Sequence, residues 1–597
     1  MRAASESLRA ELPPRKLEST SMAARDLESG RTRRRVALLM DAIEDEYQVG
    51  IVRGAASAAQ HANVELVCLA GGPLGDSERD ARPRRNFLFD LLDPRDFDGI
   101  LLLGGSLGNH VGLEALSQWT ERFGGLPKVS LGVELPNCHN VVVDCAPGMR
   151  ETLRHLIETH HHRRIAFIRG PATSFEAEQR YHAYREVLAQ HQIAEDPRLV
   201  LTGDWLRDSG ASAMRELFDV RGIAVDAVSA IASANDYMAL GAMEALRERG
   251  VSVPGDIAVT GFDDVNMGRC AVPALTTVAQ PTDALGREGI QRLVSLMSGK
   301  SEPRLSQLPT TVVGRRSCGC SKATVLMHRR GPAKAGRSLE VAVLERRALI
   351  FAELSRSARG SLLGAGPRWE ERLLSSLLAE LQGSSEGAFS AAVDQLMAGL
   401  HRAGADLTSA QPVLGTLRRS LQDCASGDAE SLLRIDDVLD SARELIGEWV
   451  VRGESLRRLY LVELLRDLSR VSSMLLAHER GPARREAFEA ALRRLGIPAL
   501  SLGLFTRAGK VSPVCACLAA YEPSGRVRPE TQFRSADFRA KGVFENERGA
   551  LLVQPLLFER EPLGILTVAL GEHQGSVYEQ MREAFCIALR GYRLAGG

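Results

Sequence analysis

Lysine and aromatic residues are scarce in this chain of 597 residues, and features typical of several protein classes are absent. Only seven of the 75 cationic residues are lysine, and aromatic residues make up 5% of the sequence. No apolar run approaches the ~20 residues that a membrane helix needs, and residues 1–35 lack the apolar segment of a secretory signal. Lys and Arg balance Asp and Glu at 75 each, which argues against a strongly basic nucleic-acid-binding protein.

The ten cysteines are scattered over many predicted elements and do not form a disulfide framework. A reducing compartment is therefore favoured, and we expect a cytoplasmic protein. Cys318-x-Cys320 and Cys515-x-Cys517 are single pairs without a matching second pair or histidine cluster. Because zinc sites need about four ligands, the sequence predicts no metal. The run His160–His162 points in different directions around a helix end, so we expect it to be structural.

Catalytic signatures are also lacking. The segment Ser298–Ser301 has the Gly-Lys-Ser of a phosphate-binding loop but not its preceding glycine. No serine-hydrolase elbow, zinc-protease motif, kinase signature or diguanylate cyclase motif is present. The sequence thus predicts a protein that is not an enzyme and that needs no cofactor.

Residues 1–35 carry nine Lys/Arg and five Asp/Glu and almost no periodic apolar pattern, which predicts a disordered tail. The Arg31–Arg35 cluster could touch nucleic acid or could be a solvated flank before a strand.

From residue 36 to 316, short apolar strands alternate with amphipathic helices, the pattern of parallel sheets covered on both faces. About 280 residues suit two α/β lobes, with a ligand in the cleft beyond the carboxyl ends of the strands. The predicted strands are Val36–Met40, Val64–Ala70, Gly99–Gly104, Lys128–Val133, Arg164–Arg169, Ala227–Ser233 and Ile257–Phe262.

The rest of the chain divides into a helical segment, residues 317–480, and a small α+β domain, residues 481–597. The α+β domain is expected to have four strands and a closing helix over Tyr578–Tyr592. Within the helical segment, a 3-4-3-4 spacing fits either a short heptad seam or an ordinary bundle face. That spacing is formed by Leu461, Leu464, Leu468, Val471 and Leu475.

A set of motifs in residues 36–316, in family order and at family spacing, resembles the sensor domain of the LacI/GalR family of bacterial repressors. The motifs are His162–Ile168, Arg180 before Tyr184, Gly203–Trp205, Ala234–Gly241, Val253–Ile257, Gly261–Asp264, Leu275–Val278 and Gln280–Pro281. The resemblance implies a two-lobed periplasmic-binding-protein-like fold that binds a small polar molecule, of sugar or nucleoside class, and that pairs as a homodimer.

The family normally begins with a helix-turn-helix, for which residues 1–35 show no pattern, so we do not expect direct DNA binding. Residues 317–597 are similar to bacterial regulators in which this sensor is followed by a helical segment and a GAF-like domain. The Ser317–Cys320 junction and the Gln554–Phe558 segment carry that looser similarity.

The resemblance places ligand contacts in the second lobe. Asp263 follows a strand and can accept hydroxyl hydrogen bonds, or it is a loop carboxylate or a helix cap. Trp205 offers an indole face to a sugar or base, and Arg180 offers a planar fork of donors or lies on a helix surface. Asn235 is the better ligand candidate of its pair, since Asp236 also suits a helix N-cap.

Three further positions complete the expected site. Asp41 ends the first strand, Tyr47 can line the pocket, and Gln280 lies at a predicted lobe crossing, where it can reach ligand or hinge. Acidic residues at Glu44–Glu46 replace the polar and apolar residues of the family, and they either select a cationic ligand or face solvent.

The sequence thus favours a cytoplasmic, non-enzymatic transcriptional regulator that relays lobe closure to a separate output protein. Two other functions stay open: a repressor that binds DNA directly through its basic N-terminal tail, and the input subunit of a split histidine kinase or diguanylate cyclase.

Overall fold

The structure, a computed structural model, forms two compact units, one from Met1–Leu326 with Arg470–Gly597 and one from Met327–Ser469. Residues 1–32 of the predicted tail, residues 1–35, lie outside the described residues, and the predicted boundary is corrected because Arg35 is the first residue of a buried strand. The described residues are 33–75, 82–320, 339–358, 362, 365–403, 405–425, 429–476, 489–507, 509–522, 532–539, 543–544, 549–571 and 575–594.

The first lobe is built on six parallel strands, and their apolar runs are buried on both faces. Every residue of Val36–Met40 is fully buried, which explains why this strand is continuously apolar. The sequence pattern missed two strands, β5 and β11, which close one side of the sheet. In spatial order the strands are β11 (Leu305–Pro309), β5 (His139–Asp144), β4 (Lys128–Leu131), β3 (Gly99–Leu103), β1 (Arg35–Met40) and β2 (Glu65–Ala70).

Helices pack on both faces of this sheet. On one face α2 (Glu46–His61) packs along α11 (Thr282–Met297), and α11 packs on β3, β4 and β5. Alternate strand residues, among them Leu39 and Leu102, face a second core that includes residues of the short helices on the other side. Those helices are α3 (Phe87–Asp90), α4 (Gly104–Leu107) and α5 (Gly112–Thr120).

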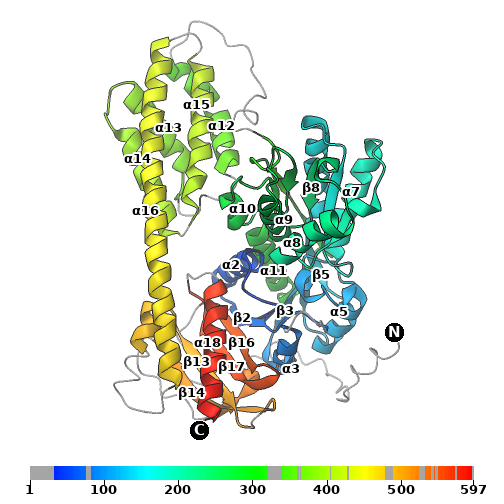
Figure 1. The fold of residues 1–597 in the computed structure, drawn as a ribbon. Helices are drawn as coiled ribbons and strands as arrows, with labels where there is room; N and C mark the ends of the chain where they lie inside the picture. The colour runs from blue at the N-terminus through cyan, green and yellow to red at the C-terminus, as the bar shows by residue number, and fades with distance from the viewer. Residues whose placement is uncertain are drawn as a thin grey trace. The chain divides into compact units, whose positions relative to one another are not determined.

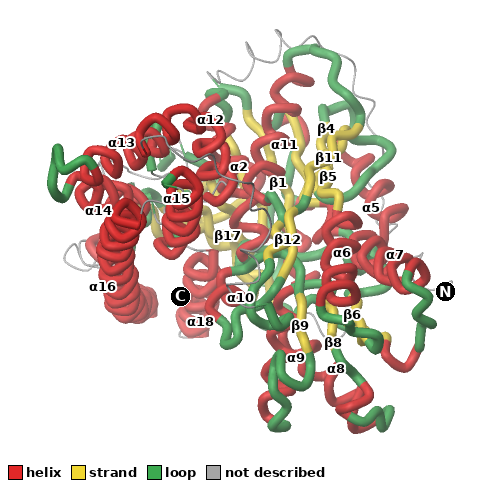
Figure 2. Tube along the Cα trace, turned by 90° about the horizontal axis from the view of Figure 1, so that it is seen from above, coloured by secondary structure: helices red, strands yellow, loops and turns green. Residues whose placement is uncertain are grey.

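The second lobe holds a separate parallel sheet in the order β7-β6-β8-β9. Figure 2 shows β6, β8 and β9 among helices α6–α9. The strands are β6 (Ile165–Arg169), β7 (Val200–Thr202), β8 (Ala230–Ser233) and β9 (Ala258–Thr260). The helices are α6 (Cys145–Arg154), α7 (Phe175–Gln190), α8 (Arg207–Arg215), α9 (Asp236–Glu248) and α10 (Asn266–Cys270). Two further strands, β10 (Thr277–Ala279) and β12 (Thr311–Val313), pair antiparallel as a ribbon of their own. The two-lobed α/β prediction is confirmed.

The C-terminal domain continues the first lobe's sheet (Figure 1). Strand β16 pairs in parallel with β2, with Leu551, Leu552 and Val553 opposite Val67, Cys68 and Leu69. One eleven-stranded sheet results, with a shared core that reaches from Leu69 to Ile565. The other elements are β13 (Leu500–Phe505), β14 (Val514–Tyr521), β15 (Gln532–Arg534), β16 (Leu551–Phe558), β17 (Glu561–Ala569) and α18 (Gly575–Leu594).

The second unit is helical and has its own core, to which Phe389, Leu417 and Ile435 contribute. The five residues of the predicted 461–475 seam fall on α16, and their side chains lie outside the described residues. The helices are α12 (Leu339–Ala358), α13 (Trp369–Leu381), α14 (Ala388–Arg402), α15 (Ala410–Cys424) and α16 (Ala429–Leu476).

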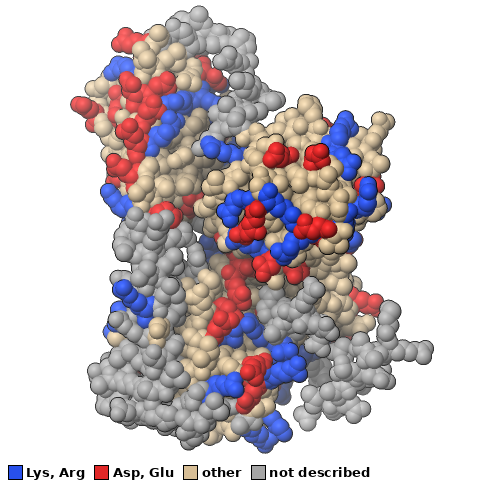
Figure 3. Space-filling view, in the orientation of Figure 1, with Lys and Arg blue, Asp and Glu red and all other residues tan. Residues whose placement is uncertain are grey.

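The described residues include no helix of sufficient length and apolar character to span a bilayer. On the face drawn in Figure 3, the charged side chains of the described residues are of both signs and lie interspersed.

Candidate functional site

The expected ligand-binding residues follow the carboxyl ends of strands in both lobes. Asp41 comes directly after β1 and Asn235 two residues after β8, while Trp205 and Asp263 follow β7 and β9 by three residues. Trp205 and Asp263 have positive φ angles of 74° and 117°, which are strained for residues with side chains. Such strain clusters at functional positions.

Arg180 on α7 is the centre of the second-lobe group. It is 2% exposed, and its Nη1 donates to the carbonyl of Ala234 at 2.8 Å. Its guanidinium carbon lies 4.0 Å from the ring centre of Phe262 and 5.4 Å from that of Trp205. The alternative that places Arg180 on a helix surface is wrong, because the side chain is buried and packs against both rings.

Asp263 completes an ion pair with this arginine. Its Oδ1 lies 4.0 Å from Arg180 Nη1 and accepts a 2.6 Å hydrogen bond from Gln280 Nε2. Burial raises the pKa of Asp263 to about 7, although Arg180 and the Gln280 hydrogen bond oppose the rise and Glu176 adds to it. Asp263 and Gln280 are thus in direct contact beyond the end of β9, and their contact with a ligand stays a prediction.

Glu176 shares Arg180 with Asp263. Its Oε2 lies 3.4 Å from Arg180 Nη2, one helical turn along α7. Burial raises the pKa of Glu176, with Arg180 opposing. Two buried carboxyls therefore face one guanidinium, and the burial of charge favours retention of a proton between them.

Tyr47 reaches this group from the first lobe. A methyl group on Gly132 would lie 3.4 Å from Tyr47 Oη and 3.3 Å from Glu176 Oε1, so the two oxygens converge on the same place. Burial, followed by Glu176, raises the pKa of Tyr47 well above its ordinary value. The hydroxyl consequently stays protonated and available as a donor.

Several buried polar atoms of this cluster have no hydrogen-bond partner among the described residues. They are Tyr47 Oη, Glu176 Oε1, Arg180 Nε and Gln280 Oε1. Buried polar groups in folded proteins are nearly always paired with protein, water or ligand. The cluster therefore offers both donors and acceptors to a polar molecule.

Trp205 and Asn235 act together. Asn235 Nδ2 donates to the Trp205 carbonyl at 2.9 Å, while its Oδ1 accepts from the amide of Met238 at 2.9 Å. A methyl group on Gly170 would come within 2.5 Å of the indole, so the ring lies against the end of β6. The geometry makes Asn235 a support for the Trp205 loop.

Asp236 has a different role from the one expected. Asn235, and not Asp236, is the N-cap of α9. The buried Asp236 carboxylate accepts from Thr277 Oγ1 at 2.6 Å and from the amide of Val265 at 2.9 Å. These bonds tie α9 to neighbouring segments, and the fully buried Asp236 is therefore a structural residue and not a ligand contact.

Asp41 is anchored within the first lobe. Ser106 Oγ donates to its Oδ1 at 2.5 Å, and Gln48 Nε2 lies 3.4 Å from both carboxylate oxygens. Gln48 Oε1 has no partner within the described chain. Asp41 therefore holds Ser106 and Gln48 in place at the first lobe's strand ends.

In the acidic run Glu44–Glu46, the exposure of Glu44 and Glu46 agrees with the solvent-facing alternative, and these two side chains also make polar contacts. Glu46 Oε2 accepts from the amide of Asn266, in the second lobe, at 2.8 Å. Glu44 lies 4.0 Å from Arg85. Both side chains are exposed, and Glu46 bridges the two lobes.

Sequence reasoning missed Glu176, Cys145, Ser106 and Gln48. The i, i+4 spacing of Glu176 and Arg180 placed both on one face of a predicted helix and could have revealed the first of these. Cys145, whose Sγ lies 3.7 Å from Arg180 Nη2, is the first residue of α6 and directly follows β5, a strand that the pattern did not predict.

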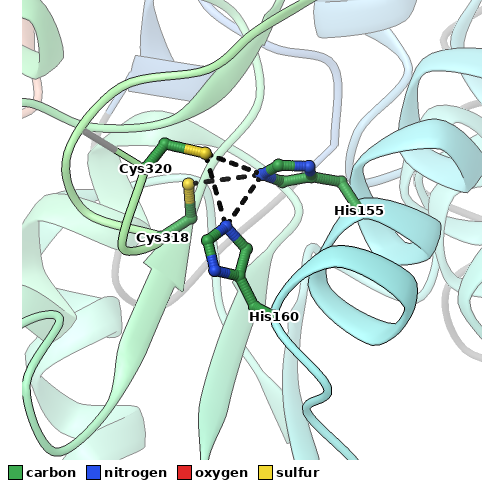
Figure 4. A group of neighbouring side chains, drawn as sticks. All are labelled: His155, His160, Cys318 and Cys320. Atoms are coloured by element: carbon green, nitrogen blue, oxygen red, sulfur yellow. Dashed lines mark hydrogen bonds between the residues drawn. The ribbon is translucent and has the colours of Figure 1, made fainter. Parts of the chain in front are cut away.

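A second cluster stands apart from this one. His155, His160, Cys318 and Cys320 bring four potential metal ligands within 4.8 Å of one another (Figure 4). The premise that the Cys318–Cys320 pair lacks a histidine cluster is wrong, because His155 and His160 lie beside it; in the sequence, His155 was overlooked and His160 was assigned a structural role.

Comparison with known proteins places this architecture in context. The family model of the periplasmic binding protein-like domain matches residues 153–318. The HTH-type transcriptional regulator CelR of Thermobifida fusca is 36% identical over 280 residues, which are 46% of this chain and 76% of that protein. The HTH-type transcriptional repressor CytR of Escherichia coli (strain K12) is 28% identical over 274 residues, 45% of this chain and 74% of that protein.

A solved structure, described as a transcriptional regulator CelR–cellobiose complex, is 34% identical to this chain. It covers 50% of this chain and 92% of its own, with a TM-score of 0.42.

Proposed function

Because this chain belongs to the LacI/GalR family of transcriptional regulators, we propose that its two lobes sense a small polyhydroxylated molecule, a sugar or nucleoside. The ligand lies against Tyr47 of the first lobe and Trp205, Arg180, Asp263 and Gln280 of the second. The single observation that carries the proposal is the set of unpartnered donors and acceptors that converge from both lobes.

The chemistry of the cluster favours hydroxyl groups. A sugar hydroxyl both donates and accepts, so one molecule can satisfy the acceptors Glu176 and Gln280 and the donors Tyr47 and Arg180. The Trp205 indole offers an apolar face, which suits the C–H face of a pyranose or a flat base. Since Asp263 and Glu176 share one arginine, hydroxyl donors also relieve the excess of buried acceptors.

We propose that the change caused by ligand binding is transmitted to the C-terminal domain, which we take to be GAF-like. Its helix α18 begins beside the loop that leads from Asp41 to Tyr47: a methyl group on Gly575 would collide with the Ile43 carbonyl at 1.5 Å. A ligand that pulls Tyr47 toward the second lobe would move this loop, and with it the contact to α18. A homodimer and a separate output protein would complete the pathway.

The test is a thermal-shift screen on the full chain with monosaccharides, disaccharides including cellobiose, nucleosides and amino acids. A ligand at a hundredfold excess over its Kd stabilises by about 2.7 kcal/mol, which is readily detected. Asp263→Ala should weaken binding of the best compound by about 1.5–3 kcal/mol, roughly tenfold or more. Trp205→Ala should cost a similar amount through lost apolar contact.

The matched control is Asp226→Ala, which removes an exposed carboxylate from the same lobe and should leave the affinity unchanged. Neither site variant should lower the Tm of the unliganded protein by much. A Trp205→Ala protein that unfolds, together with a wild type that no compound stabilises, would refute the proposal and assign Trp205 to the core.

A further inference from the structure

Four potential metal ligands from distant parts of the chain point at a common centre at the end of the sensor domain (Figure 4). His155 and His160 lie at the carboxyl-terminal end of α6. Cys318 and Cys320 lie just after β12, where the chain leaves the second lobe. Sequence separations of 158 to 165 residues divide the two histidines from the two cysteines, so only the tertiary fold brings them together.

Four of the six distances between these atoms are close to those of a metal tetrahedron, and all four atoms lie within 4.8 Å of one another. The two Nε2 atoms are 3.2 Å apart, Cys320 Sγ is 3.3 Å from each of them, and Cys318 Sγ is 3.5 Å from His155 Nε2. With Zn–N of about 2.0–2.1 Å and Zn–S of about 2.3 Å, tetrahedral geometry requires about 3.3 Å between nitrogens and about 3.5 Å between nitrogen and sulfur.

The local backbone is shaped to present the two histidines. Residues His155–Thr159 form a π-helical turn at the end of α6. A π-turn closes an i to i+5 hydrogen bond, so residues five apart are brought close, as His155 and His160 are here. Such turns recur at functional sites.

Hydrogen bonds and a glycine also fix the backbone on which the two cysteines lie. Ser317 Oγ donates to the Val259 carbonyl at 2.5 Å and accepts from the amide of Thr276 at 2.8 Å. Gly319 has a φ of 97°, and a methyl group there would lie 3.4 Å from the His160 ring, so glycine lets the Cys-x-Cys turn pass over the imidazole.

The surroundings suit a thiolate ligand. Cys318 and Cys320 are 1% and 7% exposed. Thr276 Oγ1 accepts from the amide of Arg315 at 2.8 Å and donates to Cys318 Sγ at 3.1 Å. A hydroxyl donor to a ligating sulfur is a typical supporting interaction around a metal.

We propose that His155, His160, Cys318 and Cys320 bind a structural zinc ion that fastens the chain leaving the sensor domain to the end of α6. Two thiolates and two neutral imidazoles carry two negative charges, which a divalent cation neutralises in this largely buried place. A tetrahedral Cys₂His₂ set is the preference of zinc, and with all four positions filled by protein the site is structural, not catalytic.

Such an ion has a mechanical consequence. In the sequence, the helical unit follows Cys320, so the zinc would fix, relative to the second lobe, the point at which the chain leaves the sensor domain.

The experiment measures metal in the full chain, produced without an affinity tag in zinc-supplemented medium and purified without chelators. Mass spectrometry of the dissolved metal should give about one zinc per chain. Metal-free protein titrated with Co²⁺ should develop the visible bands of tetrahedral cobalt and a near-ultraviolet thiolate-to-cobalt band. Zinc-loaded protein should melt at a higher Tm than the metal-free form.

Variants locate the ion. His155→Ala and Cys320→Ser should each reduce the zinc content to about a tenth or less of the wild-type value after dialysis. The controls are His182→Gln and Cys270→Ser, which alter an exposed histidine and an exposed cysteine of the same lobe and should retain the metal.

If a variant of a metal ligand does not fold, the zinc content and the cobalt spectrum of the wild-type protein are sufficient to test the proposal. Absence of zinc from the purified wild type, combined with no cobalt spectrum from reduced metal-free protein, would overturn the proposal. A disulfide between Cys318 and Cys320 in protein purified under reducing conditions would also overturn it, and would indicate a redox pair. Zinc retained in both ligand variants would place the ion elsewhere.

Discussion

Asp263 is the residue on which the electrostatics of the candidate site depend. It shares Arg180 with Glu176, and burial raises its pKa from 3.8 to about 7. Two carboxyls with one cation leave one negative charge uncompensated when both ionise. In the absence of a ligand this uncompensated charge destabilises the folded protein. A bound molecule that donates hydrogen bonds to the carboxyls would reduce that destabilisation.

The raised pKa predicts a pH dependence of stability. Between the unfolded value near 3.8 and the folded value of about 7, the native state binds more protons at Asp263 than the unfolded state. The free energy of unfolding should therefore fall as pH rises through this window. Urea unfolding of the full chain at pH 5 and pH 7.5 measures the slope, and Asp263→Asn should flatten it.

The matched control for this measurement is Asp226→Asn on the surface of the same lobe, which should leave the slope as in the wild type. An Asp263→Asn protein whose stability varies with pH just as the wild type does would show that Asp263 titrates normally.

Among the elements, the pair α2 and α11 shows why glycine recurs along certain helices. A methyl group on Gly54 would come within 1.9 Å of the Asp283 carbonyl, and one on Gly286 within 2.0 Å of the Ile51 carbonyl. The two helices thus meet backbone to backbone. Helices α8 and α9 of the second lobe do the same through Gly210 and Gly241.

A glycine-to-alanine substitution should have opposite effects on stability at two helical positions, one inside this contact and one outside it. Gly54→Ala forces α2 and α11 apart and should destabilise the first unit by about 1–3 kcal/mol or more. Gly447→Ala in α16 meets nothing within 4 Å and should stabilise its own unit by about 0.5–1 kcal/mol. Denaturant unfolding followed by circular dichroism checks both, and a neutral Gly54→Ala would show that the helices can separate freely.

At the scale of the whole molecule, the C-terminal domain is joined to the first lobe by more than strand pairing. Glu579 on α18 accepts from Arg85 at 2.7 Å, Arg582 at 2.5 Å and Gln554 at 3.0 Å. Burial opposes its charge, but Arg582 and Arg85 hold the pKa of Glu579 below its ordinary value. The ionised carboxylate therefore links the first lobe to the added sheet.

Removing Glu579 should lower the free energy of unfolding by more than removing its partner Arg85. Glu579→Ala leaves the buried guanidinium of Arg582 and the half-buried one of Arg85 without this carboxylate and should destabilise the protein by about 3–5 kcal/mol. Arg85→Ala leaves Glu579 with Arg582 and Gln554 and should cost about 1.5–3 kcal/mol. Asp90→Ala, which breaks an exposed pair with Arg122, should cost about 1 kcal/mol or less. Chemical unfolding of the four proteins compares them; equal losses for Glu579 and Arg85 would contradict the shared network.

The sequence by itself determined the two α/β lobes and where the candidate site lies. Apolar runs such as Val36–Met40 must be buried on both faces, and polar residues that follow such runs, Asp41 and Asp263 among them, must lie at the carboxyl edge of a sheet. Local pattern and family motifs suffice for those conclusions, because they depend on residues that are close in the sequence.

Only the tertiary structure decided which distant groups meet. Glu176 joins Tyr47 through packing of one lobe against the other, and no periodicity encodes that. The pairing of β2 with β16 uses backbone hydrogen bonds, which every strand edge offers, so side-chain patterns could not predict it. His155, His160, Cys318 and Cys320 form one cluster because the chain returns to α6 after more than 150 residues, and that return depends on the whole intervening fold.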